Sequence, residues 1–335
     1  MNETLETAKI AHANGDLDTA KQKYDEVLKA DPNMLETLEL RGAALGAMGD
    51  MKGAIADFTR AISLSDKNSD MYFNRALAYA HNGQLDLAIN DYTEAIRIND
   101  DPLAHTQRAF IHMETGDFPK ALKDLDAAID VMSEDPSLYV HRAMIKRAME
   151  NDDSALDDMN KAIELDATFA PAFTERGYLR ADKEEWEGAL MDFTTVIELD
   201  PDAANAWFDR ATAYDDMGQI DNALADYTKA GELDPTFAEA FSNRGLLKEQ
   251  LPDTDGAFAD YALAISATPD FAQSYLNRGT LYVQQADFAS ALKDISTARD
   301  LFIEEGALEE ANEAIELINW VAQEAQKQLQ NDSKQ

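Results

Sequence analysis

The residues of this chain that could do chemistry are its carboxylates, its arginines and its five histidines. The 335 residues include 65 Asp and Glu against 29 Lys and Arg, a formal net charge of −36. So many carboxylates lie near one another by chance that no pair stands out as a general acid and base. No two histidines have the H-E-x-x-H spacing that binds a metal ion from one helix. The histidines are His12, His81, His105, His112 and His141.

One charged pattern recurs regularly along the chain. Eight arginines are each followed by an aspartate sixteen residues later. Such pairs could hold two helices together, or the arginines could form a row that binds an acidic ligand. The arginines are Arg41, Arg75, Arg108, Arg142, Arg176, Arg210, Arg244 and Arg278. The aspartates are Asp57, Asp91, Asp124, Asp158, Asp192, Asp226, Asp260 and Asp294.

The elements that must position these pairs form a repeat of 34 residues, shortened to 33 in the third copy. Each copy reads as a helix, a tight turn near the fifteenth place, and a second helix. Glycine often occupies the turn, and an aspartate that follows it can cap the second helix. The copies begin at Met1, Leu35, Ser69, Pro102, Pro136, Ala170, Ala204, Ala238 and Ala272. The capping aspartates are Asp16, Asp50, Asp117, Asp253 and Asp287.

Three places in each repeat predict how its two helices pack. The eighth place is always Ala or Gly, which allows close approach of the helices. The twentieth place is alanine throughout: Ala20, Ala54, Ala88, Ala121, Ala155, Ala189, Ala223, Ala257 and Ala291. The twenty-fourth place is large and apolar and should fill the core: Tyr24, Phe58, Tyr92, Leu125, Met159, Phe193, Tyr227, Tyr261 and Ile295.

The arginine and aspartate of each pair stand at the seventh and twenty-third places, eight residues either side of the turn. At 1.5 Å rise per residue, each lies about 12 Å along its helix, so the two are level in an antiparallel pair. The first repeat has Thr7 and Lys23 instead and lacks both charges. We therefore predict a bidentate, partly buried Arg–Asp pair inside each of the other repeats. The arginine row for an acidic ligand is the alternative.

The chain resembles the tetratricopeptide repeat family over about residues 1–305. The family's bulky fourth place is held by Tyr72, Tyr139, Phe173, Trp207, Phe241 and Tyr275, its eleventh-place tyrosine by Tyr79, Tyr214 and Tyr282, and its late proline by Pro32, Pro201, Pro235 and Pro269. The resemblance implies an all-α, right-handed α-solenoid of nine helical pairs. We expect residues 306–330 to form an amphipathic C-terminal capping helix, with a dimer seam as the alternative, and residues 331–335 to be disordered.

Some places depart from the family pattern. His105 and His112 stand where the family has core aromatic residues, and we expect them to be packing residues. The eleventh place is basic in three repeats, and we expect the stems of these side chains to lie on apolar surface with their charged ends exposed. They are Lys146, Arg180 and Lys248. Pro252 replaces the turn glycine in the eighth repeat, where we expect an altered turn.

The resemblance further implies a concave groove lined by the second, fifth, sixth, ninth, twelfth and thirteenth places of each first helix. The candidate partner-binding residues at these places are apolar anchors or polar groups that can bond a peptide backbone. The apolar candidates are Phe73, Leu77, Phe110, Met113, Val140, Met144, Tyr178 and Phe208, and the polar ones are Asn74, Gln107, His141, Asp209, Asn243 and Asn277. The alternative is that the apolar residues pack on one another. Beyond Tyr178 the groove turns acidic.

We interpret the chain as a non-catalytic scaffold that binds a protein or peptide segment with apolar anchors and a neutral to basic charge. A self-assembling structural protein, joined through the C-terminal helix or stacked repeats, is the alternative. No catalytic constellation, cofactor motif or metal site is visible, and the missing cysteines exclude thiolate zinc sites. The acidic charge argues against nucleic acid and anionic membranes. No signal peptide or membrane span is visible, and we therefore expect a cytoplasmic protein. A homo-oligomer is a possible state of it.

Overall fold

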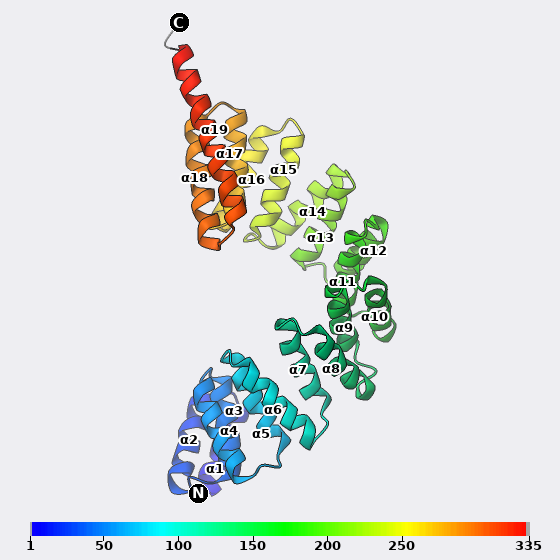
Figure 1. The fold of residues 1–335 in the computed structure, drawn as a ribbon, viewed down its shortest axis with the longest axis vertical. Helices are drawn as coiled ribbons and strands as arrows, with labels where there is room; N and C mark the ends of the chain where they lie inside the picture. Colours follow the sequence, from blue (N-terminus) through cyan, green and yellow to red (C-terminus); the bar gives the residue numbers. More distant parts are fainter. Residues whose placement is uncertain (1, 333–335) are drawn as a thin grey trace. The chain divides into compact units, whose positions relative to one another are not determined.

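Helices joined by short turns make up residues 2–332, the part of the chain that a computed structural model describes (Figure 1). It divides into two compact units, Met1–Ala172 and Phe173–Gln335. The helices of the first unit are α1 Asn2–Ala13, α2 Leu17–Ala30, α3 Leu35–Ala47, α4 Met51–Leu64, α5 Ser69–His81, α6 Leu85–Ile98, α7 Pro102–Glu114, α8 Phe118–Val131, α9 Pro136–Ala148 and α10 Asp152–Leu165. The division falls within α11, Ala170–Asp182.

The second unit continues the alternation of shorter and longer helices. Its helices after α11 are α12 Trp186–Leu199, α13 Ala204–Asp216, α14 Ile220–Leu233, α15 Ala238–Gln250, α16 Thr254–Ala267, α17 Ala272–Gln284, α18 Phe288–Glu305 and α19 Leu308–Asp332. From the second repeat onward, every first helix begins at the residue where the sequence predicts that the repeat begins. The prediction of an all-α repeat solenoid is confirmed.

Capping and turn residues explain the helix boundaries. The five predicted aspartate caps each accept a hydrogen bond from a backbone N–H in the first turn of their helix, as Asp16 does from Thr19. The fifteenth place adopts the left-handed conformation in eight of the nine repeats, with φ of +69 to +84° where it is glycine. In the eighth repeat Pro252 follows an extended Leu251, with φ −92° and ψ 154°, so the predicted alteration of that turn is confirmed.

Three turns adopt the left-handed conformation without glycine, at Glu150, Glu184 and Ala286. A Cβ atom makes this conformation unfavourable, because it approaches the following carbonyl oxygen. We expect Ala286→Gly to raise the free energy of unfolding by about 1 kcal/mol, even though glycine also gives the unfolded chain more entropy. Urea unfolding followed by circular dichroism measures the change.

The reverse substitution, Gly218→Ala, is the matched control. A Cβ at Gly218, where φ is +69°, would meet no atom within 4 Å, so its cost is that of the backbone conformation alone. We expect Gly218→Ala to destabilise by about the same 1 kcal/mol. A stabilising Gly218→Ala, or a destabilising Ala286→Gly, would contradict this explanation of the turns.

The predicted core places are buried. Every twentieth-place alanine has a relative exposure of 0%, and every twenty-fourth-place side chain is at most 2% exposed. The small eighth place faces the twenty-fourth place within a repeat. A Cβ at Gly177 would lie 2.6 Å from the ring of Phe193, and one at Gly245 would lie 2.8 Å from the ring of Tyr261. These close approaches explain why the eighth place accepts only the smallest residues.

All eight predicted Arg–Asp pairs form, and all are bidentate. In each, Nε and Nη2 of the arginine donate to the two carboxylate oxygens over 2.6–3.1 Å. The aspartates are 1–6% exposed. The prediction of a structural pair is confirmed, because every arginine places two of its donors on a carboxylate of its own repeat.

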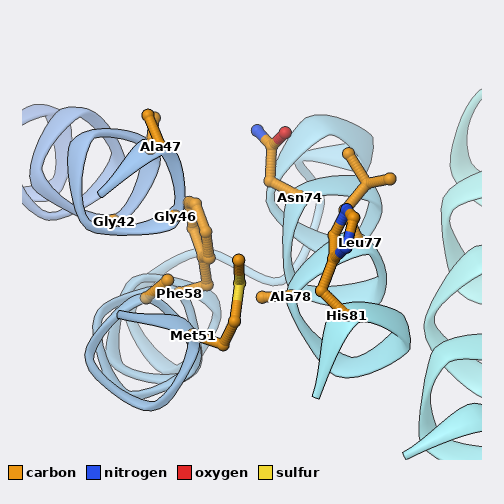
Figure 2. A pocket seen from close by; sticks show the side chains of 11 residues that line it. Gly42, Gly46, Ala47, Met51, Phe58, Asn74, Leu77, Ala78 and His81 are labelled. Carbon is orange, nitrogen blue, oxygen red and sulfur yellow. The ribbon is translucent and has the colours of Figure 1, made fainter. Parts of the chain in front are cut away.

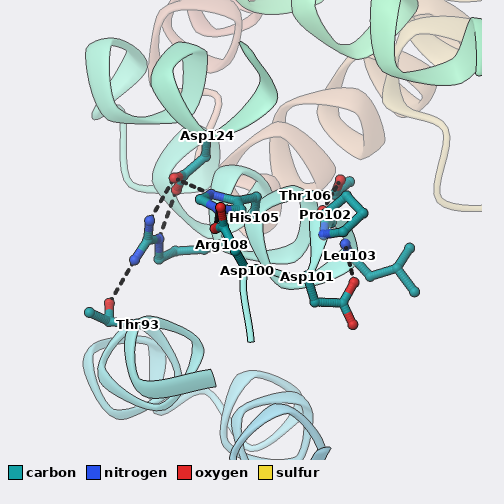
Figure 3. A network of polar contacts seen from close by, with 9 residues as sticks. All are labelled: Thr93, Asp100, Asp101, Pro102, Leu103, His105, Thr106, Arg108 and Asp124. Atoms are coloured by element: carbon teal, nitrogen blue, oxygen red, sulfur yellow. Dashed lines mark hydrogen bonds and ion pairs between the residues drawn. The ribbon is translucent and has the colours of Figure 1, made fainter. Parts of the chain in front are cut away.

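The remaining guanidinium nitrogen of six arginines joins neighbouring repeats, a contact that was not predicted from the sequence. Nη1 of Arg108 donates to Thr93 on α6 over 2.8 Å, while Nε and Nη2 bond Asp124 on α8 (Figure 3). The acceptors all stand at the twenty-fifth place of the preceding repeat: Asp25, Thr59, Thr93, Asp126, Thr194 and Thr228. Each such arginine therefore holds its own helical pair together and positions that pair against its neighbour.

The expectation of exposed charged ends at the eleventh place is wrong. Nζ of Lys146 lies 2.7 Å from Asp158, Nη1 of Arg180 lies 2.8 Å from Asp192, and Nζ of Lys248 lies 2.8 Å from Asp260. In these repeats the buried carboxylate binds a second cation, because the eleventh place lies one helical turn beyond the seventh on the same face.

His105 is buried, as expected of a packing residue, but it is also a hydrogen-bonding residue. Its Nδ1 lies 3.0 Å from Asp124 Oδ1 and its Nε2 lies 2.7 Å from Asp100 Oδ1 (Figure 3). Burial alone would raise the pKa of Asp124, but the hydrogen bonds from Arg108 and His105 hold it below its ordinary value. His112 is 6% exposed, and burial lowers the pKa of its imidazole.

The last helix packs on the ninth repeat. Gly306, with φ +80°, separates α18 from α19, and Ala311, Ala314 and Val321 of α19 are at most 2% exposed. These residues join the same apolar clusters as Phe302 and Ile295 of α18. The helix runs to Asp332, two residues into the segment expected to be disordered, and residues 333–335 lie outside the described part of the chain.

Candidate partner-binding face

The candidate residues lie on the first helices of the repeats. Successive first helices contact one another, as α3 does with α1 and α5 in the first unit, and α15 does with α17 in the second. We call inner face the side of these helices that carries the second, fifth, sixth, ninth, twelfth and thirteenth places. The inner face is described separately for each unit.

The apolar candidates of the first unit divide into partly exposed and buried residues. Phe73, Leu77, Phe110, Met113 and Met144 are partly exposed. The ring of Phe73 packs edge-on against Tyr92 at 5.6 Å between centroids. The inner face therefore keeps accessible apolar surface, although its aromatic residues rest on the core beneath them.

Two candidates of the first unit differ from the expectation. Val140 is 4% exposed and joins the apolar core of the fourth and fifth repeats, so it cannot offer a partner the contact expected of it. His141 packs edge-on against Phe110 at 4.7 Å. Its Nδ1 is buried without a hydrogen-bond partner, and burial lowers the pKa of its imidazole. Gln107 is partly exposed.

A pocket of about 270 Å³ opens on the inner face between the second and third repeats. Figure 2 shows Gly42, Gly46 and Ala47 of α3 on one side, Asn74, Leu77 and His81 of α5 on the other, and Met51 and Phe58 of α4 between them. The complete lining is Gly42, Ala43, Gly46, Ala47, Met51, Ala54, Phe58, Asn74, Leu77, Ala78 and His81. The pocket exists because α3 carries Gly or Ala at four places where larger side chains would fill the space between the helices.

Asn74 and Leu77 were predicted from the sequence, but the opposite wall of this pocket was not. The prediction rested on large apolar side chains at inner-face places, whereas the pocket depends on small ones. The sequence does show these small residues, because Gly or Ala occupies every place from 42 to 47 except Leu45. These small residues mark one wall, but whether they border a void depends on the side chains packed opposite them.

In the second unit one hydrogen bond joins two of the candidates. Tyr178 Oη donates to Asp209 Oδ2 over 2.8 Å, which brings two predicted residues together. Burial raises the pKa of Asp209 to about 6, and the charge of Glu175 adds to the effect. The ring of Phe208 packs at 4.8 Å from Phe237. This part of the inner face is therefore better packed than the sequence suggested.

Two of the three predicted asparagines form hydrogen bonds within the protein. Asn277 is 7% exposed and its Nδ2 donates to Ser242 Oγ over 3.2 Å. It therefore faces the neighbouring first helix and not a partner. Asn243 is partly exposed, and its Nδ2 lies 3.4 Å from Tyr227 Oη. Asn74 borders the pocket and is partly exposed, so it is the asparagine best placed to bond a peptide backbone.

Two further observations bear on function. Among the described residues, no three or more histidine and carboxylate side chains are grouped so as to hold a metal ion. Likewise, no described helix combines the length and apolar composition that a bilayer span requires.

Comparisons with known proteins agree on the repeat. Family models described as tetratricopeptide repeat match residues 35–68, 69–102, 136–169 and 193–225, and one described as TPR repeat matches residues 212–251. Tetratricopeptide repeat protein 13 of Homo sapiens is 24% identical over 39% of this chain and 16% of its own length. The TPR repeat-containing thioredoxin TTL4 of Arabidopsis thaliana is 31% identical over 37% of this chain and 18% of its own length. The chain thus matches less than a fifth of either relative.

Solved structures show the same fold. Yeast Tom70 is 15% identical with a TM-score of 0.61, over 96% of this chain and 89% of that chain. A tetratricopeptide repeat protein from Parabacteroides merdae is 21% identical with a TM-score of 0.57, over 70% of this chain and 93% of that chain. These likenesses show that the array of paired helices observed here is a fold that solved proteins share. The chain is a tetratricopeptide repeat protein.

Proposed function

We infer that this protein is a non-catalytic scaffold whose inner face holds a segment of a partner protein. The tetratricopeptide repeat supports protein–protein interaction, and such folds are typically not enzymes. The finer proposal is that the segment carries apolar anchors and is neutral or basic. The observation that carries it is the inner face of the first unit, where partly exposed apolar side chains lie beside Asn74 and an open pocket.

The chemistry of this surface supports the proposal. Leu77, Met113 and Met144 offer apolar area at ninth and twelfth places, and unbranched methionine side chains adapt to different partners. The amide of Asn74 can donate to and accept from a peptide backbone at the same time. The net charge of −36 favours a neutral or basic segment over an acidic one.

Quantitative affinity capture from lysate tests the proposal. Wild-type bait is compared with Met144→Asp, which places a charge on the inner face. Leu87→Asp is the matched control, because Leu87 is 42% exposed on α6, a second helix. We expect Met144→Asp to lower recovery of the main partners at least fivefold and Leu87→Asp to leave it unchanged, with both baits keeping wild-type helicity. Equal recovery with Met144→Asp would contradict binding at the inner face.

Self-assembly is the second candidate, and the surface of α19 favours it. Leu308, Ile315 and Leu329 are separated by seven and fourteen residues, so they share one heptad position, and they are 63, 39 and 70% exposed. That spacing fits the seam of a coiled coil. Light scattering over a hundredfold range of concentration measures the mass, and Ile315→Glu tests the seam. A monomer mass at every concentration would refute self-assembly and leave the scaffold proposal in place.

A further inference from the structure

The pocket between α3 and α5 lies next to a group of carboxylates on the same inner face. Gly42, Gly46, Met51 and Leu77 give the pocket an apolar lining. Its polar neighbours Asn74 and His81 stand on α5. A pocket of about 270 Å³ is near the lower end of the range for small-ligand sites and suits one side chain of a partner.

The carboxylates stand at the other end of the same two helices. Glu36 and Glu39 lie in the first turns of α3, and Asp70 lies in the first turn of α5. Glu39 is partly buried and accepts a hydrogen bond from Asn68 over 3.0 Å. Burial raises the pKa of its carboxyl above the ordinary value, and the charge of Asp70 raises it further. Lys9 lies 2.6 Å from Glu36, whereas neither Glu39 nor Asp70 forms a salt bridge within the described residues.

The distance between the pocket and the carboxylates determines how far apart an apolar anchor and a cationic residue must lie in a bound peptide. Gly46 is seven residues after Glu39, which corresponds to about 10 Å along the helix axis. An extended peptide advances about 3.3 Å per residue, and a lysine or arginine side chain adds its own length. A cationic residue two or three positions from an apolar anchor can therefore reach Glu39 and Asp70 while the anchor occupies the pocket.

We propose that the second and third repeats bind a partner segment through one bulky aliphatic side chain in the pocket and a lysine or arginine two or three residues away at Glu39 and Asp70. This inference rests on the proposed function and specifies the segment. The apolar lining and the small volume select the anchor, and the unbalanced carboxylates select the cation. Asn74, at the rim between them, bonds the backbone of the segment.

Gly46 offers a substitution that closes the pocket without damaging the fold. A Cβ there would meet no atom within 4 Å, and the residue lies near the end of α3. Leucine is also a better helix former than glycine. Gly46→Leu should therefore fill the pocket and leave the melting temperature unchanged or raised. Ala56→Leu, at an exposed place on α4 of the same repeat, is the matched control.

The probe is a Gly/Ser peptide with a central leucine and a lysine two residues away on each side, so that it can bind in either direction. Methyl NMR of the full chain follows Met51 and Leu77 during titration to millimolar peptide. We expect both methyls to shift with wild type and Ala56→Leu, and the response to vanish with Gly46→Leu. Changing the central leucine to alanine should weaken binding roughly tenfold, and changing both lysines to glutamate should weaken it at least fivefold.

Two results would overturn the inference. One is that Met51 and Leu77 do not shift in wild type. The other is that Gly46→Leu binds as well as Ala56→Leu. Shifts confined to Met113 and Met144 would also reject the pocket but would keep the proposed function, because these methyls belong to another part of the inner face. The lysate capture with Met144→Asp judges that function separately.

Discussion

Replacing Asp260 with alanine is expected to lower the free energy of unfolding by about 3–5 kcal/mol, the cost of removing one member of a buried ion pair. The carboxylate is 2% exposed and binds Arg244 at 2.6 and 2.9 Å and Lys248 at 2.8 Å. Without it, two cations stay close together on the same helix. Their desolvation is then no longer offset, and they repel each other.

The control removes an exposed aspartate that binds another arginine of the same series. Asp126 binds Arg142 over 2.7 Å, but its side chain is 59% exposed, so Asp126→Ala is expected to cost no more than about 1 kcal/mol. Repeat arrays do not always unfold in a single step, so urea unfolding is combined with hydrogen exchange of α15 to α17. Equal losses for Asp260→Ala and Asp126→Ala would contradict the structural role of the buried pairs.

Replacing Asp209 with asparagine is expected to stabilise the protein at pH 7.5 by about 2–3 kcal/mol. Burial raises the pKa of this carboxyl to about 6, above the ordinary value of 3.8, and the hydrogen bond from Tyr178 only partly offsets the effect. Each unit of pKa difference corresponds to about 1.4 kcal/mol. Asparagine keeps an acceptor for Tyr178 and carries no charge that must be buried.

The sign of this effect follows from proton binding. Between pH 3.8 and about 6 the folded protein holds more protons on Asp209 than the unfolded chain does, so this residue makes stability fall as pH rises. The full cost is present above about pH 6 and disappears below pH 3.8. The advantage of Asp209→Asn over wild type should therefore shrink from pH 7.5 to pH 4.5. Hydrogen exchange of α11 to α13 at both pH values checks this, and an advantage independent of pH would contradict the raised pKa.

The charged residues separate what the sequence determines from what depends on tertiary packing. The seventh and twenty-third places were predicted to pair because both distances from the turn were equal, and all eight pairs form. The same reasoning did not reveal the bond from Arg108 to Thr93, or the second cation on Asp260. Those contacts depend on how one repeat is rotated against the next and on which side chains reach a carboxylate that is already paired.

For the candidate partner-binding residues, the sequence likewise predicted the position on a helix but not the exposure of each side chain. Phe73, Leu77 and Met144 were placed correctly on first helices and are partly exposed. Whether they bind a partner stays a prediction. Val140 occupies an equivalent place but is buried, and Asn277 bonds Ser242. Helical position alone cannot distinguish these outcomes, because exposure also depends on the volumes of the side chains in the adjacent repeat.

The sequence by itself determined the helices, their pairing and the buried ladder of charges, because these follow from a fixed rise per residue and from a period repeated nine times. Only the tertiary structure decided where the inner face is open. The pocket between α3 and α5 is the space that Gly42, Gly46 and Ala47 leave unfilled opposite Leu77. A void of this kind is a property of two helices packed together, so neither helix encodes it alone.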